Sequence, residues 1–517
     1  MFRRKFLRVT APLLALTALT CSTATPDPAP RKFPPGFLWG VATAAQESEG
    51  NNTNSDWDAF AKMGSAPPAG LAQNSYVLYE TDSANAASLH LNSFQLSIEW
   101  ARIVPKMPTD PTAPLQPGDI DQAAVAHYHA VLASLLAHGL TPVVAVTHFA
   151  LPVWVDNPAA TYDGSAKTFS DGSLGAWTNP VTGQALARYA EFLAREFGAQ
   201  VSWWLTMDEP LVALLAGYME GNFPPGLNDL DLNSATLPNG ASPKSVLVNM
   251  IAGHALAYHA MKAVQPSAKV SFAHNTVDWE PLDPASPDDV AATERVDKAY
   301  NLAFLDALTT GDFDTSLFGA GPLEHHAEWQ NTLDFLGVNY YDADFVIDKP
   351  GFLPPLDAVP CAPALKSALP QLTRVYGCPD VGPPEEPGMT KVLLKYEKRY
   401  HLPQLITESG FIDTPAGKAQ RLVRTLAAVA DGLAGGANVV GYTYWTLNYD
   451  YEWNDGWTQN MGLFTLAGFG EGKFADGAPG PSTDFTRVPL HPMVDVYGEI
   501  AGGNTIPSHL LGQYGAQ

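Results

Sequence analysis

Two acidic residues close two short apolar runs that lie far apart in the chain. The segment VSWWLTMDEP (201–210) leads to Glu209, and LPQLITESGF (402–411) leads to Glu408. Runs rich in β-branched and aromatic residues favour buried strands, where an unpaired carboxylate is costly. A glutamate at the end of such a strand therefore suggests a chemical task. Either residue alone would more often be a surface or salt-bridged group, so the prediction depends on the pair.

Two carboxyl groups that flank one site can cleave a glycosidic bond. One protonates the departing oxygen, and the other either attacks the anomeric carbon or activates a water. A separation of about 5–5.5 Å would retain the configuration of the sugar, whereas about 6.5–9.5 Å would invert it. Both outcomes stay open at this point.

The elements that must position these carboxylates form a repeating pattern of strand-like and helix-like segments. The strand-like runs are 36–43, 93–100, 141–149, 201–209, 269–277, 333–341, 403–410 and 439–447. Amphipathic segments of helical period lie between several of them, at 119–140, 181–198, 245–264 and 417–434. Alternation implies parallel pairing, and the count of eight favours closure over an open sheet. We predict one α/β domain over 33–517, a (β/α)8 TIM barrel with elaborated βα loops.

In such a barrel the strands end at one rim, which brings Glu209 and Glu408 together. Other residues near strand ends suit a sugar, which offers apolar faces to aromatic rings and hydroxyls to planar polar groups. They are His148 after the third run, Asn339, Tyr340 and Tyr341 at the end of the sixth, and Trp445, Glu452 and Trp453 around the end of the eighth. Each aromatic taken singly would more often belong to the barrel core. Their shared placement favours a binding site.

Composition limits the partners that the chain can take. A hydrophobic fraction of 46% with 16% charged residues describes a globular protein with a large core. A net charge of −24 disfavours binding to nucleic acid and anionic lipid. A need for solubility is the simpler explanation for the excess of acidic residues. A neutral small molecule or oligosaccharide fits better. The histidines and cysteines lack metal-ligand spacing, so we expect neither a metal nor a cofactor.

The N-terminus has the composition of an export signal. Residues 1–24 combine a basic start, RRKFLR, with a short apolar stretch and small residues, and 25–32 form a Pro-rich linker. The basic start also resembles a twin-arginine signal, and Cys21 offers an alternative as a lipid-anchored cysteine. No later apolar run reaches 18 residues, so we expect no transmembrane helix. The expected location is periplasmic or extracellular.

Two cysteines remain after this segment, Cys361 and Cys378, within an irregular Pro-rich stretch. An even pair in an exported chain suggests a disulfide that ties the loop, and two unpaired thiols are the alternative.

The motifs together resemble glycoside hydrolase family 1, the β-glucosidase type, from about Phe33 to Pro507. Seven segments carry the resemblance in the family's order: FPPGFLWGVATAAQESEG, SIEWARIVP, THFALPVW, TMDEP, FLGVNYY, ITESG and YWTLNYDYEWNDGW. The resemblance implies a retaining enzyme that acts on unphosphorylated β-glucosides or β-galactosides. The 6-phospho-glycosidases of the family replace the Glu452–Trp453 pair, and the thioglucosidases lack the acid at Glu209.

The resemblance also implies a role for each residue. Glu209 would be the general acid/base and Glu408 the nucleophile, with Tyr341 donating a hydrogen bond to Glu408. His148 and Glu452 would hold sugar hydroxyls. Trp445 and Trp453 would frame the sugar ring, and Asn339 is a further residue expected to bind the substrate.

Three positions depart from the family pattern near the reacting sugar. The usual glutamine is Glu47, beside Gln46; the usual arginine is Gln95; and the usual asparagine is Asp208. Each change removes positive charge or adds potential negative charge near Glu408, and losing a cation makes a carboxylate easier to protonate. A one-residue slip that gives Gln46 the usual role is disfavoured, because it would reverse the side that each residue faces.

These departures leave several readings open. Protonated carboxyls at Glu47 and Asp208 could replace the lost amides, which would suit an acidic working range, or the substrate could itself carry a cation. Two further alternatives to hydrolysis are a catalytically silent sugar-binding protein and a transglycosylase on the same site.

Overall fold

The computed structural model describes residues 28–362, 375–473, 479–481 and 484–515. The predicted signal at 1–24, with Cys21, lies outside the described residues. In the described part, no helix is long and apolar enough to span a bilayer.

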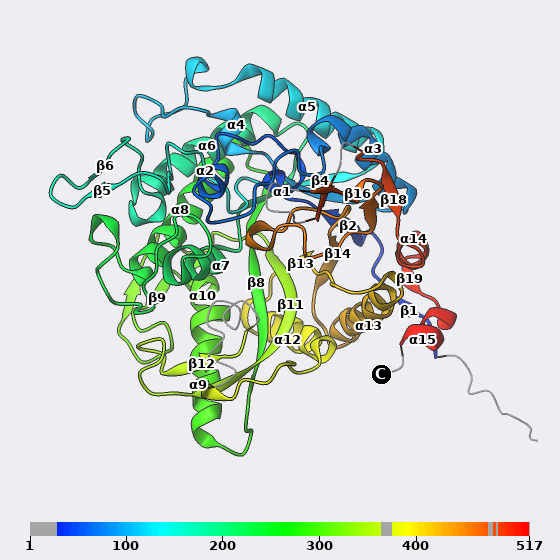
Figure 1. The fold of residues 1–517 in the computed structure, drawn as a ribbon. Helices are drawn as coiled ribbons and strands as arrows, with labels where there is room; N and C mark the ends of the chain where they lie inside the picture. The colour runs from blue at the N-terminus through cyan, green and yellow to red at the C-terminus, as the bar shows by residue number, and fades with distance from the viewer. Residues whose placement is uncertain (1–27, 363–374, 474–478, 482–483, 516–517) are drawn as a thin grey trace, which may run out of the picture.

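Eight parallel strands close into a barrel, which confirms the predicted fold (Figure 1). The strands are β2 (Leu38–Ala42), β3 (Ser93–Ser97), β4 (Thr141–Ala145), β7 (Trp203–Asp208), β8 (Lys269–Pro281), β11 (Leu336–Asp348), β13 (Gln404–Glu408) and β14 (Val439–Trp445). They are hydrogen-bonded in the order β11-β13-β14-β2-β3-β4-β7-β8. Pairing of β8 with β11, from Gly337↔Ala273 onward, completes the ring.

Helices surround this ring on its outside. The larger ones are α3 (Ser75–Ser88), α5 (Gln122–Ala137), α6 (Val181–Phe197), α8 (Pro243–Val264), α9 (Pro287–Asp297), α10 (Ala303–Thr310), α12 (Glu385–Tyr400), α13 (Pro415–Ala434) and α14 (Met493–Gly503). Some of them start at side-chain caps that the sequence supplies, such as Asp121 for α5, Ser242 for α8 and Thr414 for α13. The four predicted helical segments all contain helices.

Shorter elements decorate the loops. The short helices are α1 (Ala45–Ser48), α2 (Asp56–Lys62), α4 (Trp100–Ile103), α7 (Pro210–Leu214), α15 (Ser508–Tyr514), the π-helices η3 (Leu215–Glu220) and η5 (Lys298–Leu302), and the 3-10 turns η1 (Pro117–Asp119), η2 (Ala176–Thr178), η4 (Pro238–Gly240) and η7 (Trp453–Asp455). The short strands are β1 (Arg31–Lys32), β5 (Tyr162–Asp163), β6 (Thr168–Phe169), β9 (Asp312–Asp314), β10 (Leu323–His325), β12 (Ala358–Pro360), β15 (Phe464–Leu466), β16 (Phe469–Lys473), β17 (Pro479–Pro481), β18 (Arg487–Pro489) and β19 (Thr505–Ile506).

Alternation along the strands separates two cores. On β4, Val143 and Ala145 face the barrel interior, where they pack with Trp203, Leu205 and other interior residues. Their neighbour Val144 belongs to the larger core between strands and helices. The interior cluster fills the barrel below its rim, so polar side chains gather only above it.

The structure corrects three boundaries drawn from the sequence. Strand β11 continues seven residues past Tyr341 to Asp348, because it goes on pairing with β8 beyond the rim. His148 lies past the end of β4 and is held by an isolated bridge to Asp208. Arg31 and Lys32, predicted as linker, form β1 and pair with β19.

A disulfide joins Cys361 and Cys378, with their Cα atoms 5.4 Å apart. Both cysteines are buried beside Val359 of β12. The loop after β11 is therefore tied near the outer end of that strand.

Closure of the barrel depends on a close approach at Gly337 of β11. A Cβ there would lie 2.5 Å from the carbonyl oxygen of Phe272 and 3.1 Å from Cα of Ala273, both on β8. We predict that Gly337→Ala lowers the free energy of unfolding by about 1–3 kcal/mol, because β8 and β11 must separate. Urea denaturation measures the change. Gly164→Ala is the control, since nothing lies within 4 Å of its added Cβ; equal stability of the two variants would contradict close packing at the β8–β11 seam.

Candidate active site

A cavity of about 790 Å³ opens at the rim, and Glu209 and Glu408 both line it. The aromatic residues Tyr341, Trp445 and Trp453 line the same cavity. Strand ends three positions apart around the ring thus deliver two carboxylates to one hollow, as the sequence analysis expected.

Glu209 is held by two amide groups. It follows β7 in a left-handed conformation, with φ 41°, and caps the start of α7. Asn275 donates from Nδ2 to its Oε1 at 3.0 Å, and Asn339 donates to the same oxygen at 2.8 Å. Tyr300 in turn donates to Oδ1 of Asn275 at 2.8 Å and fixes that amide. Because both amides bind Oε1, Oε2 is the oxygen that can carry a transferable proton.

Glu408 receives a different pair of donors. The Tyr341 hydroxyl donates to Oε2 at 2.8 Å, and Gln95 donates from Nε2 to Oε1 at 3.3 Å. Gln95 thus supplies a neutral donor to the carboxylate but no cation. Asn339 links the two catalytic candidates, because its Oδ1 accepts from Thr407, the residue before Glu408, at 2.6 Å.

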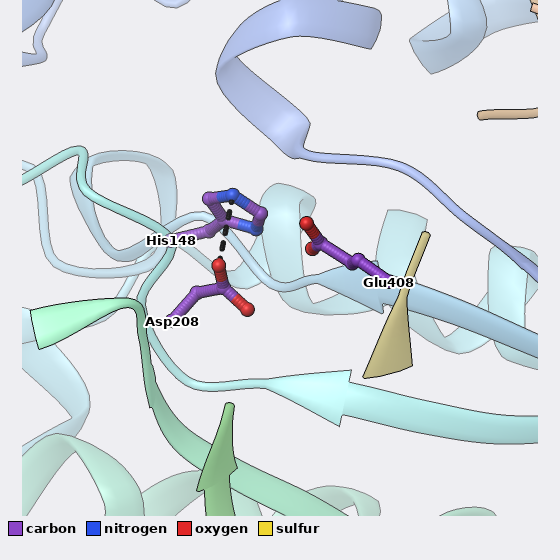
Figure 2. Close-up of side chains that lie close together, drawn as sticks. All are labelled: His148, Asp208 and Glu408. Atoms are coloured by element: carbon purple, nitrogen blue, oxygen red, sulfur yellow. Dashed lines mark ion pairs between the residues drawn. The ribbon is translucent and has the colours of Figure 1, made fainter. Parts of the chain in front are cut away.

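His148 and Asp208 lie against Glu408 (Figure 2). His148 Nε2 is 3.3 Å from Asp208 Oδ2, and one ligand-type atom from each of the three residues lies within 4.8 Å of the others. Burial lowers the pKa of His148 to about 3, so the imidazole is neutral and supplies no positive charge.

Burial and like charge together favour protonated carboxyls in this cluster. Burial, Asp208 and Glu209 raise the pKa of Glu408 well above its usual range, and the Tyr341 hydrogen bond offsets part of the effect. Burial and then Glu209 raise the pKa of Asp208. Burial raises the pKa of Glu209, which its two amide donors partly oppose. A raised pKa suits a general acid and handicaps a nucleophile.

A second cluster lies beside the first. One oxygen from each of Glu47, Asp450 and Glu452 lies within 4.8 Å of the others, and Glu47 and Asp450 have no exposed surface. Burial, then Glu452, Asp450 and Glu408, raise the pKa of Glu47 well above its usual range. Burial raises the pKa of Glu452 to about 8. Neutral carboxyls in this cluster can donate hydrogen bonds, as the lost glutamine amide would.

Rings complete the polar end of the cavity. The ring of His148 lies 5.5 Å from that of Trp453 at 22°, and 5.6 Å from that of Trp445. Glu452, which lies between Trp445 and Trp453 in the sequence, lines the cavity. Glu47 is fully buried and does not line it. Tyr340 does not line the cavity but packs in the core between strands and helices, and its hydroxyl donates to the backbone of Glu385.

Both acidic clusters have the ligand types of a metal site. In the first, however, an ion would occupy Glu408, the side chain that must reach a sugar. In the second, protonation relieves the same repulsion without an ion. The arrangement of the described residues can therefore perform acid–base and nucleophilic chemistry with its own groups.

The sequence analysis missed three residues of the site. Asn275 ends the interior part of β8 and could have been found by the strand-end rule used for Glu209. Tyr300 stands on a π-helix that no local pattern marks. Asp450 lay within the motif YWTLNYDYEWNDGW and was passed over for its neighbour Glu452.

Comparison with known proteins agrees with this geometry. The sequence profile of Glycosyl hydrolase family 1 matches residues 29–468. The beta-galactosidase of Pyrococcus woesei is 26% identical over 545 residues, covering 92% of this chain and 98% of that protein. The probable inactive beta-glucosidase 14 of Oryza sativa subsp. japonica is 27% identical over 475 residues, covering 84% and 86%. The solved beta-glycosidase of Pyrococcus horikoshii superimposes with a TM-score of 0.74 at 26% identity, over 94% of this chain and 99% of that one.

The barrel and its paired rim carboxylates define a glycoside hydrolase. The chain belongs to glycosyl hydrolase family 1, whose profile spans most of its length.

The crowding of Asp208 against Glu408 has a measurable pH signature. As the predicted nucleophile, Glu408 must be ionised for activity, and its raised pKa means that the ionised form is lost as pH falls through a value above the ordinary 4.5. We predict that Asp208→Asn shifts the acid limb of kcat/KM to lower pH, because Asp208 in its ionised form is the largest charge-based cause of the raised pKa of Glu408 and asparagine cannot ionise. The profile is measured with an aryl β-glycoside over about pH 4 to 9. Asp288→Asn, an exposed change, should leave it in place; an unmoved limb in Asp208→Asn would refute the coupling.

Proposed function

We propose that the protein is an exported, retaining β-glycosidase that hydrolyses unphosphorylated β-glucosides or β-galactosides through a covalent glycosyl–Glu408 intermediate. Glu209 gives its proton to the leaving oxygen while Glu408 attacks the anomeric carbon. Glu209 then takes a proton from water, which releases the sugar. The main observation in support is that Glu209 and Glu408 line one cavity and have different hydrogen-bond donors. Two amides donate to Glu209, and a tyrosine hydroxyl donates to Glu408.

Retention is supported by the packing between the two carboxylates. The single Asn339 side chain spans from Oε1 of Glu209 to the hydroxyl of Thr407, next to Glu408. Asp208, adjacent to Glu209, places an oxygen within 4.8 Å of one from Glu408. Such spacing favours direct attack over a route that must seat a water between them.

The charge around the cavity favours an unphosphorylated sugar. Among the described residues that line it, eight are acidic and one, Arg421, is a lysine or arginine. Arg421 is itself ion-paired with Glu385. A phosphate would meet repulsion without a free cation, whereas a neutral hydroxyl pairs with neutral carboxyls and rings. Neither sugar epimer is favoured by this charge pattern.

Export is supported by the composition of residues 1–24. The basic start followed by a short apolar stretch is typical of a signal segment, and the alternative at Cys21 would leave the enzyme anchored to a lipid.

Two other functions use the same cavity. A silent sugar-binding protein is favoured by the raised pKa of Glu408 and by Gln95 in place of a cation, and relatives with active and with inactive names are similarly distant from this chain. A transglycosylase would pass the sugar from Glu408 to an acceptor other than water.

A mechanism-based trap tests the proposal against the silent alternative. We expect a 2-fluoro β-glycoside with a good leaving group to add one glycosyl unit to the protein, located on the peptide that contains Glu408. Intact-mass and peptide mass spectrometry detect it. Glu408→Ala should remain unlabelled and lose at least about a thousandfold in kcat. Absence of label in the wild-type chain across the pH range of activity assays would remove the covalent mechanism.

The role of Glu209 predicts a dependence on the leaving group. We expect Glu209→Ala to lower kcat/KM about 10²–10⁴-fold for a glycoside whose leaving alcohol is poor, since protonation of that oxygen is lost. Substrates with acidic phenols need little protonation and should lose far less. Glu220→Ala is the matched control, a cavity glutamate without a part in the mechanism. Equal losses for both substrate types would contradict the acid role.

A further inference from the structure

Three carboxylic acids meet at the polar end of the cavity, and we name them the inner acid cluster. The cluster consists of Glu47 on α1 and of Asp450 and Glu452 in the loop after β14. One oxygen from each residue lies within 4.8 Å of the others. Glu47 and Asp450 have no exposed surface, whereas Glu452 lines the cavity. A ligand in the cavity can therefore reach the cluster through Glu452.

Most oxygens of the inner acid cluster have no hydrogen-bond donor. Both oxygens of Glu47, both of Asp450 and Oε2 of Glu452 are buried and accept no hydrogen bond of ordinary geometry from the described residues. The backbone of Trp453 and the hydroxyl of Thr446 lower the pKa values of Glu47 and Asp450, but by less than burial raises them. Buried polar atoms in native proteins are nearly always paired. Five such oxygens in one cluster thus indicate a ligand with several donors.

Positive charge near the cluster is scarce. Lys418 on α13 has no exposed surface, and its charge favours the ionised form of Asp450. Its ammonium group donates to a backbone carbonyl at 3.0 Å and to a side-chain amide oxygen at 3.3 Å rather than to a carboxylate. Arg421 is ion-paired with Glu385, and His148 is neutral. One ammonium group thus offsets three carboxyl groups.

We propose that the substrate is a β-glycoside of an aminodeoxy sugar, and that Glu452, with Glu47 and Asp450 behind it, binds a protonated amino group on carbon 3, 4 or 6 of this sugar. This inference rests on the proposed function and names its substrate class. The binding step makes and breaks no covalent bond. The ammonium takes the place of a carboxyl proton, and that proton passes to the solvent.

The position of the amino group follows from the separation of the two acid clusters. Carbon 2 adjoins the anomeric carbon, which Glu408 must reach. The groups that lie within 4.8 Å of Glu408 in the first cluster are His148 and Asp208, whereas the inner acid cluster forms a separate group. A substituent that meets Glu452 therefore belongs to a carbon farther from the anomeric centre.

An ammonium suits the inner acid cluster better than a hydroxyl does. It brings three donors and a positive charge, whereas a sugar hydroxyl donates a single hydrogen bond. Hydrogen bonds between charged partners are roughly twice as strong as neutral ones. The rings of Trp445 and Trp453 line the same cavity, and aromatic faces attract cations. The excess of acidic residues in the lining also favours entry of a cation.

Protons occupy the cluster until a cation replaces them. Burial raises the pKa of Glu452 to about 8 and that of Glu47 well above its usual range. The charged groups around the cluster are Glu209, Glu408, Asp455 and Lys418. Because three of these four are acidic, ionising the cluster is unfavourable without further positive charge. Binding of an ammonium should therefore release a proton near neutral pH, whereas a neutral sugar should release none.

A set of aryl glycosides tests the proposal. It contains 4-nitrophenyl β-glucoside and β-galactoside and their 2-, 3-, 4- and 6-aminodeoxy analogues, assayed at about pH 7. We expect a 3-, 4- or 6-amino analogue to exceed its parent at least about tenfold in kcat/KM, mainly through a lower KM, because a charged pair replaces a neutral one. Preference for the neutral parents would overturn the proposal. Preference for a 2-amino analogue alone would place the cation at Asp208 and would overturn it as well.

A charge-removing variant tests the cluster itself. Glu47→Gln keeps the size of the side chain and supplies an amide donor. We expect the advantage of the amino analogue over its parent to fall at least about tenfold, since one carboxylate is lost. Glu220→Gln makes the same change at a cavity glutamate outside the cluster and should keep the advantage. An undiminished advantage in Glu47→Gln, or activity that is lost in EDTA and restored by a divalent cation, would be incompatible with an ammonium site.

Calorimetry separates this inference from the proposed function. Methyl β-glycosides of the same sugars are titrated into Glu408→Ala in two buffers of different ionisation enthalpy, which counts the protons released. We expect up to about one proton for the preferred amino sugar and none for its parent. Amino-sugar binding with proton release but no hydrolysis by the wild-type chain would remove the proposed function alone. Hydrolysis of neutral glycosides, with neither amino preference nor proton release, would remove the ammonium site alone.

Discussion

The constraint on which this site depends is the burial of many carboxyl groups close together at one rim of the barrel. Five of them, Glu47, Asp208, Glu209, Glu408 and Asp450, are at most 7% exposed, and a sixth, Glu452, lines the cavity. Ionised carboxylates packed this closely cannot all keep their charge, and the neighbouring His148 is neutral. Protons must therefore be shared among them. The barrel makes this crowding unavoidable, because every parallel strand ends at the same rim.

The three departures from the family pattern, Glu47, Gln95 and Asp208, are consistent with one another once protons are shared. A neutral Asp208 or Glu47 can donate a hydrogen bond, which an ionised one cannot. The electrostatics also change one expectation drawn from the sequence. Because burial keeps these groups protonated well above their usual range, donors persist toward neutral pH, while the raised pKa of Glu408 opposes work in strong acid. The ionised form of Glu408 is therefore stabilised by its two hydrogen-bond donors, Tyr341 and Gln95.

Much of this arrangement could be predicted from the sequence because it is encoded locally. Each barrel strand is a short apolar run, and Glu209 and Glu408 stand directly at the ends of two of them. Residues farther from a strand end were harder to place. The length of β11 depends on pairing with β8, and Tyr340 faces outward only because strand residues alternate. The disulfide partner of Cys361 was predictable, since 378 is the single other position available after the signal.

The apolar part of the cavity wall was beyond sequence reasoning for a physical reason. Its leucines look like ordinary core residues in every local pattern, and helices α7, α8 and η3 would place them in a packed interior. Only the three-dimensional arrangement leaves space among them. That space adjoins the acid Glu209, and the polar, proton-sharing carboxyls lie on the other side. The closure of the barrel, which no local pattern records, therefore decides which side chains surround the two glutamates.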